Sequence, residues 1–424
     1  MNIVRAAVLA AATCTSVVQA QPQGDAQVIP AAKVFTLEEA VAAAGGAAPA
    51  SEAAAAAVEA AEAGQRLAGL RPNPVVQVQV ENIAGSGPYR GLRSAETTIG
   101  PAIPIELGGK RSARVAVARA QLTRAEIQQA ITAADVRLQV TQLFIEAVAA
   151  ERRLATARDQ ARIANDALRA ASIRVQAGRA SPLERQRADV AVTYAEANVE
   201  RQARLAEAAR INLVRRIGQP ISGILDGSVL DILPGTNVYG PAVPVDSSAT
   251  LALAAANADF TIAEAGVRLA RANRVPDLNV GPAIRRLEAT NDLAAVFTVT
   301  IPIPVFNNGR AAIAQATAQQ TQADALRRLT ALDIEQAITD AQAEAANAAT
   351  TARAAAGPAL ASAQEAARIA RIGYREGKFG QLELLDAERT LAETRVAAID
   401  ALAAYQNARA QLERLTARAP NAEY

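Results

Sequence analysis

The chain has 424 residues and a formal net charge of +2, and its charged residues are interspersed instead of gathered into basic tracts. Nucleic acid is therefore not expected as a partner. Aromatic residues are only 3% and histidine is absent, so a bulky single core and histidine-based catalysis are not expected. Alanine dominates the helical stretches, which favours long helices packed closely through small side chains.

The first residues have the pattern of an export signal. Arg5 precedes an apolar stretch at 6–12, and small residues at 18–20 offer a cleavage site. We therefore predict a signal peptide at 1–20. The only cysteine, Cys14, would be removed with this segment unless it carries a lipid, and the threonine before it fits a lipidation site poorly.

The next elements are predicted to be two short helices and a β-hairpin. Residues 36–70 read as helices broken at Gly45-Gly46 and Pro49. A glycine-rich loop at 84–93 separates two extended stretches that start at 75 and 95. The first stretch alternates in a way typical of a barrel strand between lipid and water. Its apolar face holds Val76, Val78 and Val80, and its polar face holds Gln77, Gln79 and Glu81.

A very long helix follows the hairpin. Nothing breaks the helical pattern from 111 to 177, and about 67 residues at a rise of 1.5 Å extend roughly 100 Å. Ser181 and Pro182 then form a helix start, so 178–181 is predicted to be a turn from which a helix returns to 217. On this stretch alone, a long coiled coil is the alternative.

The second half contains the same parts. A loop at 221–246 and a helix at 247–273 lead to strands at 277–286 and 292–303, with Pro101 and Pro282 inside strands, where proline removes a ladder donor. A long helix at 310–376 is expected to bend at Gly357-Pro358, and its return helix runs from 382 to about 418.

Equivalent positions in the two halves keep a constant spacing. Arg111 and Arg310, Gly178 and Gly377, and Glu184 and Glu383 are each 199 residues apart (310 − 111, 377 − 178, 383 − 184). The two long helices are therefore predicted to have the same length, and the repeat is architectural.

Beyond the signal, no apolar run approaches the roughly 20 residues that a membrane-spanning helix needs. If the mature protein spans a membrane, it must do so as a closed barrel. Four strands cannot close a barrel, whereas three copies of the chain can.

Several short motifs add a resemblance to these patterns. With the order of the elements, they resemble the TolC-like outer-membrane efflux family over nearly the whole mature chain, and most closely its cation-efflux (CzcC-like) branch. The motifs are Leu-Arg-Pro-Asn-Pro at 70–74, Ser-Ala-Glu-Thr-Thr at 94–98, Pro-Ile-Glu-Leu-Gly-Gly-Lys-Arg at 104–111, Arg-Val-Pro-Asp-Leu at 274–278, Gly-Lys-Phe at 377–379 and Leu-Leu-Asp-Ala at 384–387.

The resemblance implies a mainly α fold with a small β part. Two internal repeats would give four strands per protomer to a trimeric, 12-stranded outer-membrane barrel, and long antiparallel helices to a periplasmic α-barrel. The implied parts are N-terminal helices at 21–73, hairpins at 74–105 and 276–304, helical hairpins at 106–220 and 305–418 with tip turns at 178–182 and 377–381, an equatorial linker and helix at 221–275, and a tail at 419–424.

The resemblance also implies a passive conduit in a tripartite, RND-type efflux system that exports heavy-metal cations of the cobalt, zinc and cadmium or copper and silver class. The implied partners of the homotrimer are a periplasmic membrane-fusion adaptor, an inner-membrane RND pump and outer-membrane lipid. Most of the chain would lie in the periplasm of a Gram-negative cell. No cofactor and no catalysis are expected, because no nucleophile, base and orienting group appear together.

By position in the family motifs, Glu383 and Asp386 are implied to face the pore axis at the periplasmic gate. They are three residues apart and so share one helix face. Stabilisation of a helix N-terminus is the other interpretation of these carboxylates. Tyr374 and Glu184 match a family contact between the two turns, so we expect Tyr374 to donate to Glu184. Ordinary packing is the alternative for the tyrosine.

The turns are implied to be where the adaptor docks, since they are the ends farthest from the membrane. Exposed polar turn residues without a binding role are the simpler interpretation. The residues expected in this contact are Gly178, Arg179, Ser181, Gly377 and Lys378.

Three other functions remain open at this point. The same fold could serve multidrug efflux or type I protein secretion. A periplasmic coiled-coil scaffold or adaptor without a pore is the alternative of another class, and the alternating strands argue against it.

Overall fold

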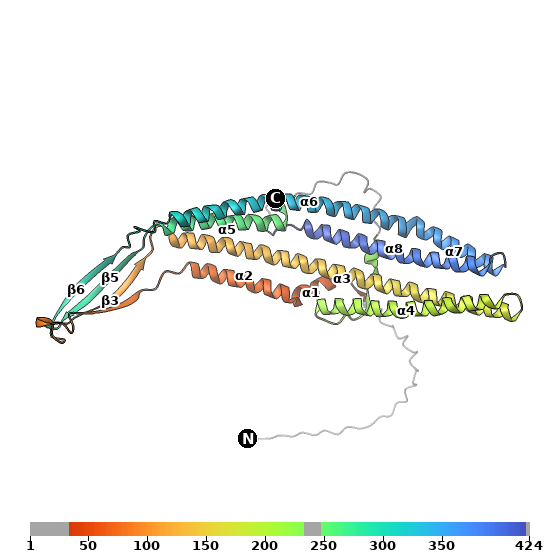
Figure 1. The fold of residues 1–424 in the computed structure, drawn as a ribbon, viewed down its shortest axis with the longest axis horizontal. Coiled ribbons are helices and arrows are strands. Elements are labelled where there is room, and N and C mark those ends of the chain that lie inside the picture. Colours follow the sequence, from red (N-terminus) through yellow and green to blue (C-terminus); the bar gives the residue numbers. More distant parts are fainter. Residues whose placement is uncertain (1–33, 233–246, 421–424) are drawn as a thin grey trace, which may run out of the picture.

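The chain is drawn out along one axis, with a sheet at one end, a layer of long helices in the middle and two helical tips at the other end (Figure 1). The computed structural model describes residues 34–232 and 247–420. The predicted signal peptide, Cys14 and part of the predicted linker, 233–246, lie outside the described residues. None of the described helices is both long enough and apolar enough to cross a membrane.

Two short helices begin the described part, as predicted. Thr36 caps α1 (Leu37–Ala47) in a capping box with Glu39. The predicted break at Gly45-Gly46 is wrong, because both glycines lie inside α1. The helix ends at Ala47, Ala48 is its C-cap, and Pro49 takes the first position of α2 (Pro49–Ala68). Proline has no amide hydrogen to donate to a preceding turn, so it starts a helix and cannot extend one.

The sheet joins the hairpins of the two repeats. β2 (Val75–Glu81) and β3 (Glu96–Ile105) form the first hairpin, and β5 (Leu278–Leu287) and β6 (Asp292–Thr300) form the second. All neighbours are antiparallel in the order β2-β3-β5-β6, which confirms the four predicted strands. The first connecting loop contains the 3₁₀ turn η1 (Gly87–Tyr89).

One face of this sheet is exposed and apolar except for Thr97 and Arg286, which lie near the hairpin loops. The register pairs Val78 with Ile99 and Ile99 with Ile284, so these side chains share a face. Val76 and Phe297 belong to the same face and are 71% and 69% exposed. A soluble monomer rarely exposes a contiguous apolar surface of this kind, so the face requires an apolar environment.

The opposite face is polar and is organised by Arg285. Its guanidinium donates to Glu96 at 2.8 Å, to Glu81 at 3.1 Å and to the Thr98 hydroxyl at 2.9 Å. The contacts connect β2, β3 and β5 across the strand direction. The alternation predicted for β2 therefore extends across the sheet.

The two strand prolines lie opposite each other. Ile99 pairs with Ile284 and Ile103 with Val280, and the β3–β5 ladder is interrupted between these pairs, where Pro101 faces Pro282. Both prolines pair normally on their other sides, with Val76 and Phe297. The effect of the two prolines, which lack a backbone amide hydrogen, is thus confined to one short gap in the β3–β5 ladder. At this gap a side-chain carbon on Gly100 would collide with the Pro282 carbonyl and Ala283.

The first repeat contains one unbroken helix, α3 (Lys110–Gln176), of 67 residues. It returns as α4 (Pro182–Ile217). Both bounds agree with prediction to within a residue. Alanines make up much of its buried surface, so neighbouring helices approach closely.

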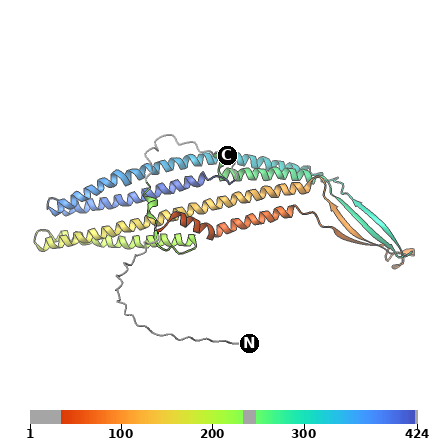
Figure 2. The same cartoon turned by 180° about the vertical axis from the view of Figure 1, so that it is seen from behind.

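The helical layer follows the strand order. α2 and α4 lie along one side of α3, and α5 (Leu251–Asn273) and α8 (Gln381–Leu415) lie along the other, as both views show (Figure 1, Figure 2). α5 follows a 3₁₀ turn, η3 (Ser247–Ala249), and meets α8 end to end, where the Leu251 amide donates to the Ala417 carbonyl at 3.0 Å. α6 contacts both α5 and α8, so it forms the far edge of the layer.

The long helix of the second repeat is bent where predicted. α6 (Arg310–Ala354) passes through a π turn, η4 (Ala355–Ala359), into α7 (Leu360–Arg375). Gly357 leaves helical geometry with φ −98° and ψ −106°, directly before Pro358. A proline inside a helix removes a hydrogen bond and collides with the preceding turn, which accounts for the bend.

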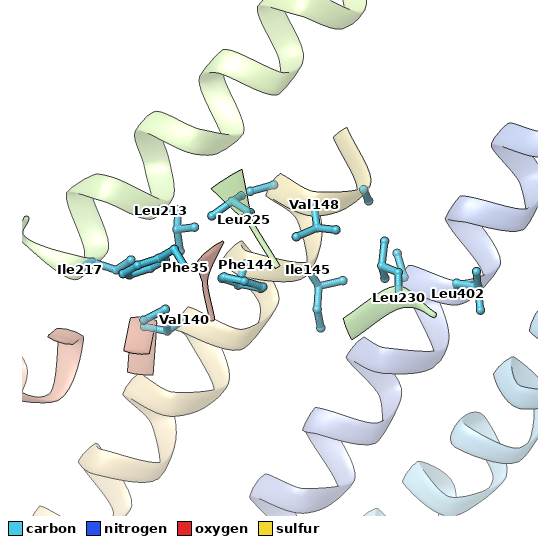
Figure 3. Packing of buried hydrophobic residues seen from close by; sticks show 14 of the residues in the cluster. Phe35, Val140, Phe144, Ile145, Val148, Leu213, Ile217, Leu225, Leu230 and Leu402 are labelled. Atoms are coloured by element: carbon cyan, nitrogen blue, oxygen red, sulfur yellow. The ribbon is translucent and has the colours of Figure 1, made fainter. Parts of the chain in front are cut away.

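The largest buried core among the described residues lies midway along α3, at 136–149. Figure 3 shows how its side chains pack. The sequence did not reveal its smallest parts, β1 (Val34–Phe35) and β4 (Ile224–Leu225), which pair in parallel and are only two residues long. The turn η2 (Gly227–Leu230) adds Leu230. The labelled side chains of this core are Phe35, Val140, Phe144, Ile145, Val148, Leu213, Ile217, Leu225, Leu230 and Leu402.

Three consecutive charged residues of α3 fix this middle level. Each one pairs with a different element, so α3 holds α4, the segment after η2 and α8 at a single height. The pairs are Glu151–Arg210 at 2.9 Å, Arg152–Asp231 at 2.7 Å and Arg153–Asp400 at 2.8 Å.

A polar joint connects the sheet to α3. Glu106 accepts two hydrogen bonds from Arg114, one of them at 3.1 Å, and Arg114 also donates to the Leu70 carbonyl. Lys110, buried at the start of α3, pairs with Asp277 before β5 at 2.6 Å. The motif at 104–111 therefore ties the first repeat to the second. The hydrogen bond from Arg114 holds the pKa of Glu106 below its usual value of 4.5, although burial acts in the opposite direction.

Replacing Gly100 with alanine should destabilise the sheet by about 1–3 kcal/mol, because the added methyl group collides with the backbone of β5. We expect a lower apparent melting temperature in detergent, measured by circular dichroism. Gly64→Ala in α2, where a methyl group meets nothing within 4 Å, is the matched control and should be neutral or slightly stabilising. Equal melting temperatures for wild type and Gly100→Ala would contradict the close approach.

Replacing Glu106 with glutamine should destabilise the joint by about 1–2 kcal/mol at neutral pH. Because the pKa of Glu106 is lowered in the folded chain, its stabilisation is full above pH 4.5 and disappears as the pH falls through the lowered pKa. The difference in melting temperature between wild type and Glu106→Gln should therefore shrink on acidification below about pH 4. A difference independent of pH would show that ionised Glu106 contributes nothing.

Candidate functional site

The two helical tips have the same backbone conformation. Gly178 and Gly377 have φ values of +66° and +72°, in the left-handed region that favours glycine. The next amide then bonds back over five residues in each turn. The Arg179 amide donates to the Arg174 carbonyl and the Lys378 amide to the Gly373 carbonyl, both at 2.8 Å.

The residues predicted for adaptor docking lie on the outside of these turns. Arg179, Ser181 and Lys378 are exposed, and a side-chain carbon on either Gly178 or Gly377 would meet nothing within 4 Å. Ser181 also caps α4, since its side chain accepts from the Leu183 amide at 3.3 Å. The five residues are accessible to a partner, and their role in docking stays a prediction.

Glu383 and Asp386 are both exposed at the start of α8. A carboxylate oxygen of Glu383 reaches back over Gly380. It would lie 2.7 Å from the Cβ atom if residue 380 had a side chain. Gly380 precedes the helix and has no side chain to cap it. Glu383 thus occupies the positive end of the helix dipole, while both carboxylates remain open to solvent on one side of α8.

The predicted hydrogen bond from Tyr374 to Glu184 is not formed within the chain. The Tyr374 hydroxyl and one Glu184 carboxylate oxygen are buried, and neither has a hydrogen-bond partner in the described residues. Tyr374 is 9% exposed because its ring packs against Ala370 and Leu384. The packing alternative therefore describes its position in a single chain.

Other side chains connect the two tips instead. The guanidinium of Arg174 lies 4.9 Å from the centre of the Tyr374 ring, a cation–π contact between α3 and α7. The Gln381 side-chain amide donates to the Glu184 carbonyl at 3.1 Å. Neither Arg174 nor Gln381 was predicted from the sequence. Arg174 could have been considered, because it is a cation in the last turn of α3, next to the tip.

The ring of Phe379 folds back over Gly373, where a side-chain carbon would overlap it. The second turn is therefore closed by an aromatic contact with the last turn of α7. Only a glycine at 373 allows the ring this position.

An ion pair between a half-exposed arginine and a buried carboxylate, above the tips, was also not predicted. Arg371 on α7 makes two hydrogen bonds to Glu388 on α8, one at 2.7 Å, and Glu388 is 9% exposed. This bonding raises the pKa of Arg371 above its usual value. Glu388 falls between Leu384 and Leu391 on the buried face of α8, and a charge in an apolar stripe was the available signal.

The ion pair borders a cavity of about 490 Å³ between α3 and the α7–α8 hairpin. Its walls carry charges of both signs, including Asp159, Arg162 and Asp166 from α3. Among the described residues no group of three or more potential metal ligands comes together. The tips thus offer carboxylates to an approaching cation without a built coordination site.

Comparison with known proteins agrees with the repeated architecture. The model of the family described as "Outer membrane efflux protein" matches residues 44–219 and 248–418, one segment for each repeat. Among solved structures, CusC superposes with a TM-score of 0.73 at 19% identity, covering 90% of this chain and 92% of that chain. This likeness shows the fold.

Two curated relatives are metal-resistance proteins of Cupriavidus metallidurans. The cobalt-zinc-cadmium resistance protein CzcC is 30% identical over 394 residues, which cover 92% of this chain and 91% of CzcC. The nickel and cobalt resistance protein CnrC is 32% identical over 275 residues, or 63% of each chain. With both repeats matched and a TolC-like fold, the chain belongs to the outer membrane efflux protein family.

Proposed function

We propose that this chain is the outer-membrane channel of a three-part efflux system and that it exports heavy-metal cations. The two-faced sheet carries the proposal. Its apolar face, with Val76, Ile284 and Phe297, suits lipid, and its polar face, with Arg285 and Glu81, suits a water-filled lumen.

A closed barrel requires more than one copy of the chain. β2 and β6 are the outer strands of the sheet order. β2 leads away from the helices and β6 leads back, so β6 of one copy can pair antiparallel with β2 of the next. Three copies related by rotation would give twelve strands without an exposed edge.

The helical layer would continue this ring into the periplasm as a tunnel. Because the helices follow the same order as the strands, each copy contributes a wall segment with α2 and α4 at one edge and α6 and α7 at the other. α3 alone extends roughly 100 Å from the joint to the tip. Transport would be passive, with energy supplied by an inner-membrane pump through an adaptor that docks on the tip turns.

The gate would lie at the tips. Three copies of Glu383 and Asp386 would form two carboxylate rings around the axis, a geometry that attracts cations. The Arg371–Glu388 pair ties α7 to α8, so this hairpin would move as one unit.

The names of the relatives support the proposed cargo. CzcC and CnrC are named for resistance to cobalt, zinc and cadmium and to nickel and cobalt. Since the described residues include no cluster of metal ligands, selection among ions would be made by the pump and the adaptor. Drug efflux and protein secretion on the same fold are the competing outcomes of the second test below.

Replacing Glu383 with glutamine and Asp386 with asparagine should weaken block of single-channel current by divalent cations. The two rings lose their charge, and we expect half-block to need a roughly tenfold higher ion concentration, equivalent to about 1.4 kcal/mol. The measurement is a titration of zinc or cobalt in planar bilayers. Glu52→Gln, an exposed carboxylate in the first turn of α2, is the control and should leave block unchanged. Equal block in the double variant would mean that these carboxylates do not face the pore.

Deleting the gene should raise the cellular content of the exported metal. We would measure zinc, cobalt, cadmium, nickel and copper by mass spectrometry in the deletion strain and in its complemented parent, each under sublethal exposure. Selective accumulation of one or more ions, reversed by complementation, is the expected result. Unchanged levels of all five, with redundant channels also deleted, would favour drug efflux or secretion.

A further inference from the structure

The connections between the sheet and the helices are built unequally. The connection at 69–74 is held by Arg111 and Arg114 of α3, which bond to the Gly69 and Leu70 carbonyls. The connections at 106–109 and 274–277 hold each other through Asp277, which bonds to Lys110 and to the Leu107 amide. The fourth described connection, 301–309, has no comparable ties among the described residues.

Comparison of the two repeats shows which residues of 301–309 stand in place of these polar ties. At the 199-residue spacing, Glu106 corresponds to Val305 and Lys110 to Gly309. The second repeat therefore has no equivalent of the charged side chains of Glu106 and Lys110. Ile303, Val305 and Phe306 are instead 81%, 72% and 101% exposed.

This apolar connection is nevertheless held in shape locally. The Asn307 side chain accepts from the Gly309 amide and the Asn308 side chain from the Arg310 amide, both at 3.2 Å. The Val305 amide donates to the Ile303 carbonyl at 2.9 Å. Phe306 thus projects from a hydrogen-bonded turn. A fully exposed phenylalanine on an ordered turn is typical of a residue that is buried when a partner binds.

We propose that Phe306, with Ile303 and Val305, packs against the end of α2 and the start of β2 in a neighbouring copy of this chain. The proposal rests on the trimer proposed above and names its contact below the sheet. The surface formed by Ile303, Val305 and Phe306 is called the edge anchor.

The opposite edge of the chain offers a matching surface at the same level. Leu67 and Leu70 at the end of α2 and Val75 at the start of β2 are all exposed. The edge anchor begins three residues after the end of β6 (303 − 300), Leu70 lies five residues before the start of β2 (75 − 70), and Val75 is the first residue of β2. If β6 pairs with β2 of the next copy, both segments leave the sheet on the side of the helices and meet there. The contact would continue the strand pairing into the joint and exclude water from it.

Disulfide cross-linking of the full chain in outer-membrane fragments tests the contact. The only native cysteine is removed by Cys14→Ser. Phe306→Cys is then combined in turn with Leu67→Cys, Leu70→Cys or Val75→Cys, and the fragments are oxidised. At least one pair should give disulfide-linked dimers and trimers on non-reducing gels. Phe306→Cys with Leu183→Cys, an exposed residue at the first tip, is the control pair and should give none.

The oligomeric state, measured by light scattering in detergent, separates the two proposals. A trimer in which none of the three pairs cross-links would overturn the edge anchor and leave the channel proposal standing. A monomer would overturn the trimer and the edge anchor together.

A second pair of variants tests the energy of the contact. Phe306→Ser should shift the trimer-to-monomer midpoint to about tenfold or higher protein concentration, as expected for a buried anchor. Phe306→Leu should restore most of the association. Circular dichroism should show unchanged helix content in both, because Phe306 contacts little within its own chain. An unchanged midpoint for Phe306→Ser would also overturn the proposal.

Discussion

The structure depends on a sheet that cannot satisfy itself within one chain. Four antiparallel strands leave β2 and β6 as outer strands, and the face with Val78, Ile99 and Ile284 is exposed. Unpaired edges and a continuous apolar face are both unfavourable in water. In the proposed channel, burial between copies and in lipid would remove both costs, so association and membrane insertion would stabilise this fold together.

The helices extend this constraint away from the sheet. Their order repeats the strand order, and the Lys110–Asp277 pair transfers the alignment of β3 and β5 to α3 and α5. Charged residues of α3 then fix α4 and α8 at mid-length. Between these ion pairs, alanine side chains suffice to pack the helices against one another. The low aromatic content of the sequence therefore reflects an architecture of long, shallow contacts.

Features governed by local signals could be predicted from the sequence. The alternation at β2, the uninterrupted α3, the turn at Ser181 and the bend at Gly357 agree with the structure, because each depends on neighbouring residues. The position of Gly45-Gly46 inside α1 was missed, because glycine only weakens a helix whereas proline ends it.

Contacts between distant parts of the chain could not be predicted in the same way. The Arg371–Glu388 pair and the two-residue strands β1 and β4 depend on how the hairpins pack. Tyr374 shows the limit of transferring a residue role by motif. Tyr374 lies where the two tips meet, but its ring faces Arg174 and its hydroxyl has no hydrogen bond to Glu184.

The break at Gly357 gives the two hairpins different mechanical stiffness. α3 is an uninterrupted rod, so a sideways load on the first tip is transmitted along it to the joint at Lys110. The corresponding helix of the second repeat is divided at η4, where the π turn lacks regular helical hydrogen bonding. A sideways load on the second tip can bend the α6–α7 helix there, whereas α8 beside it is unbroken. The two repeats therefore differ in where they can bend: α3 is continuous, and the corresponding helix of the second repeat is interrupted at η4.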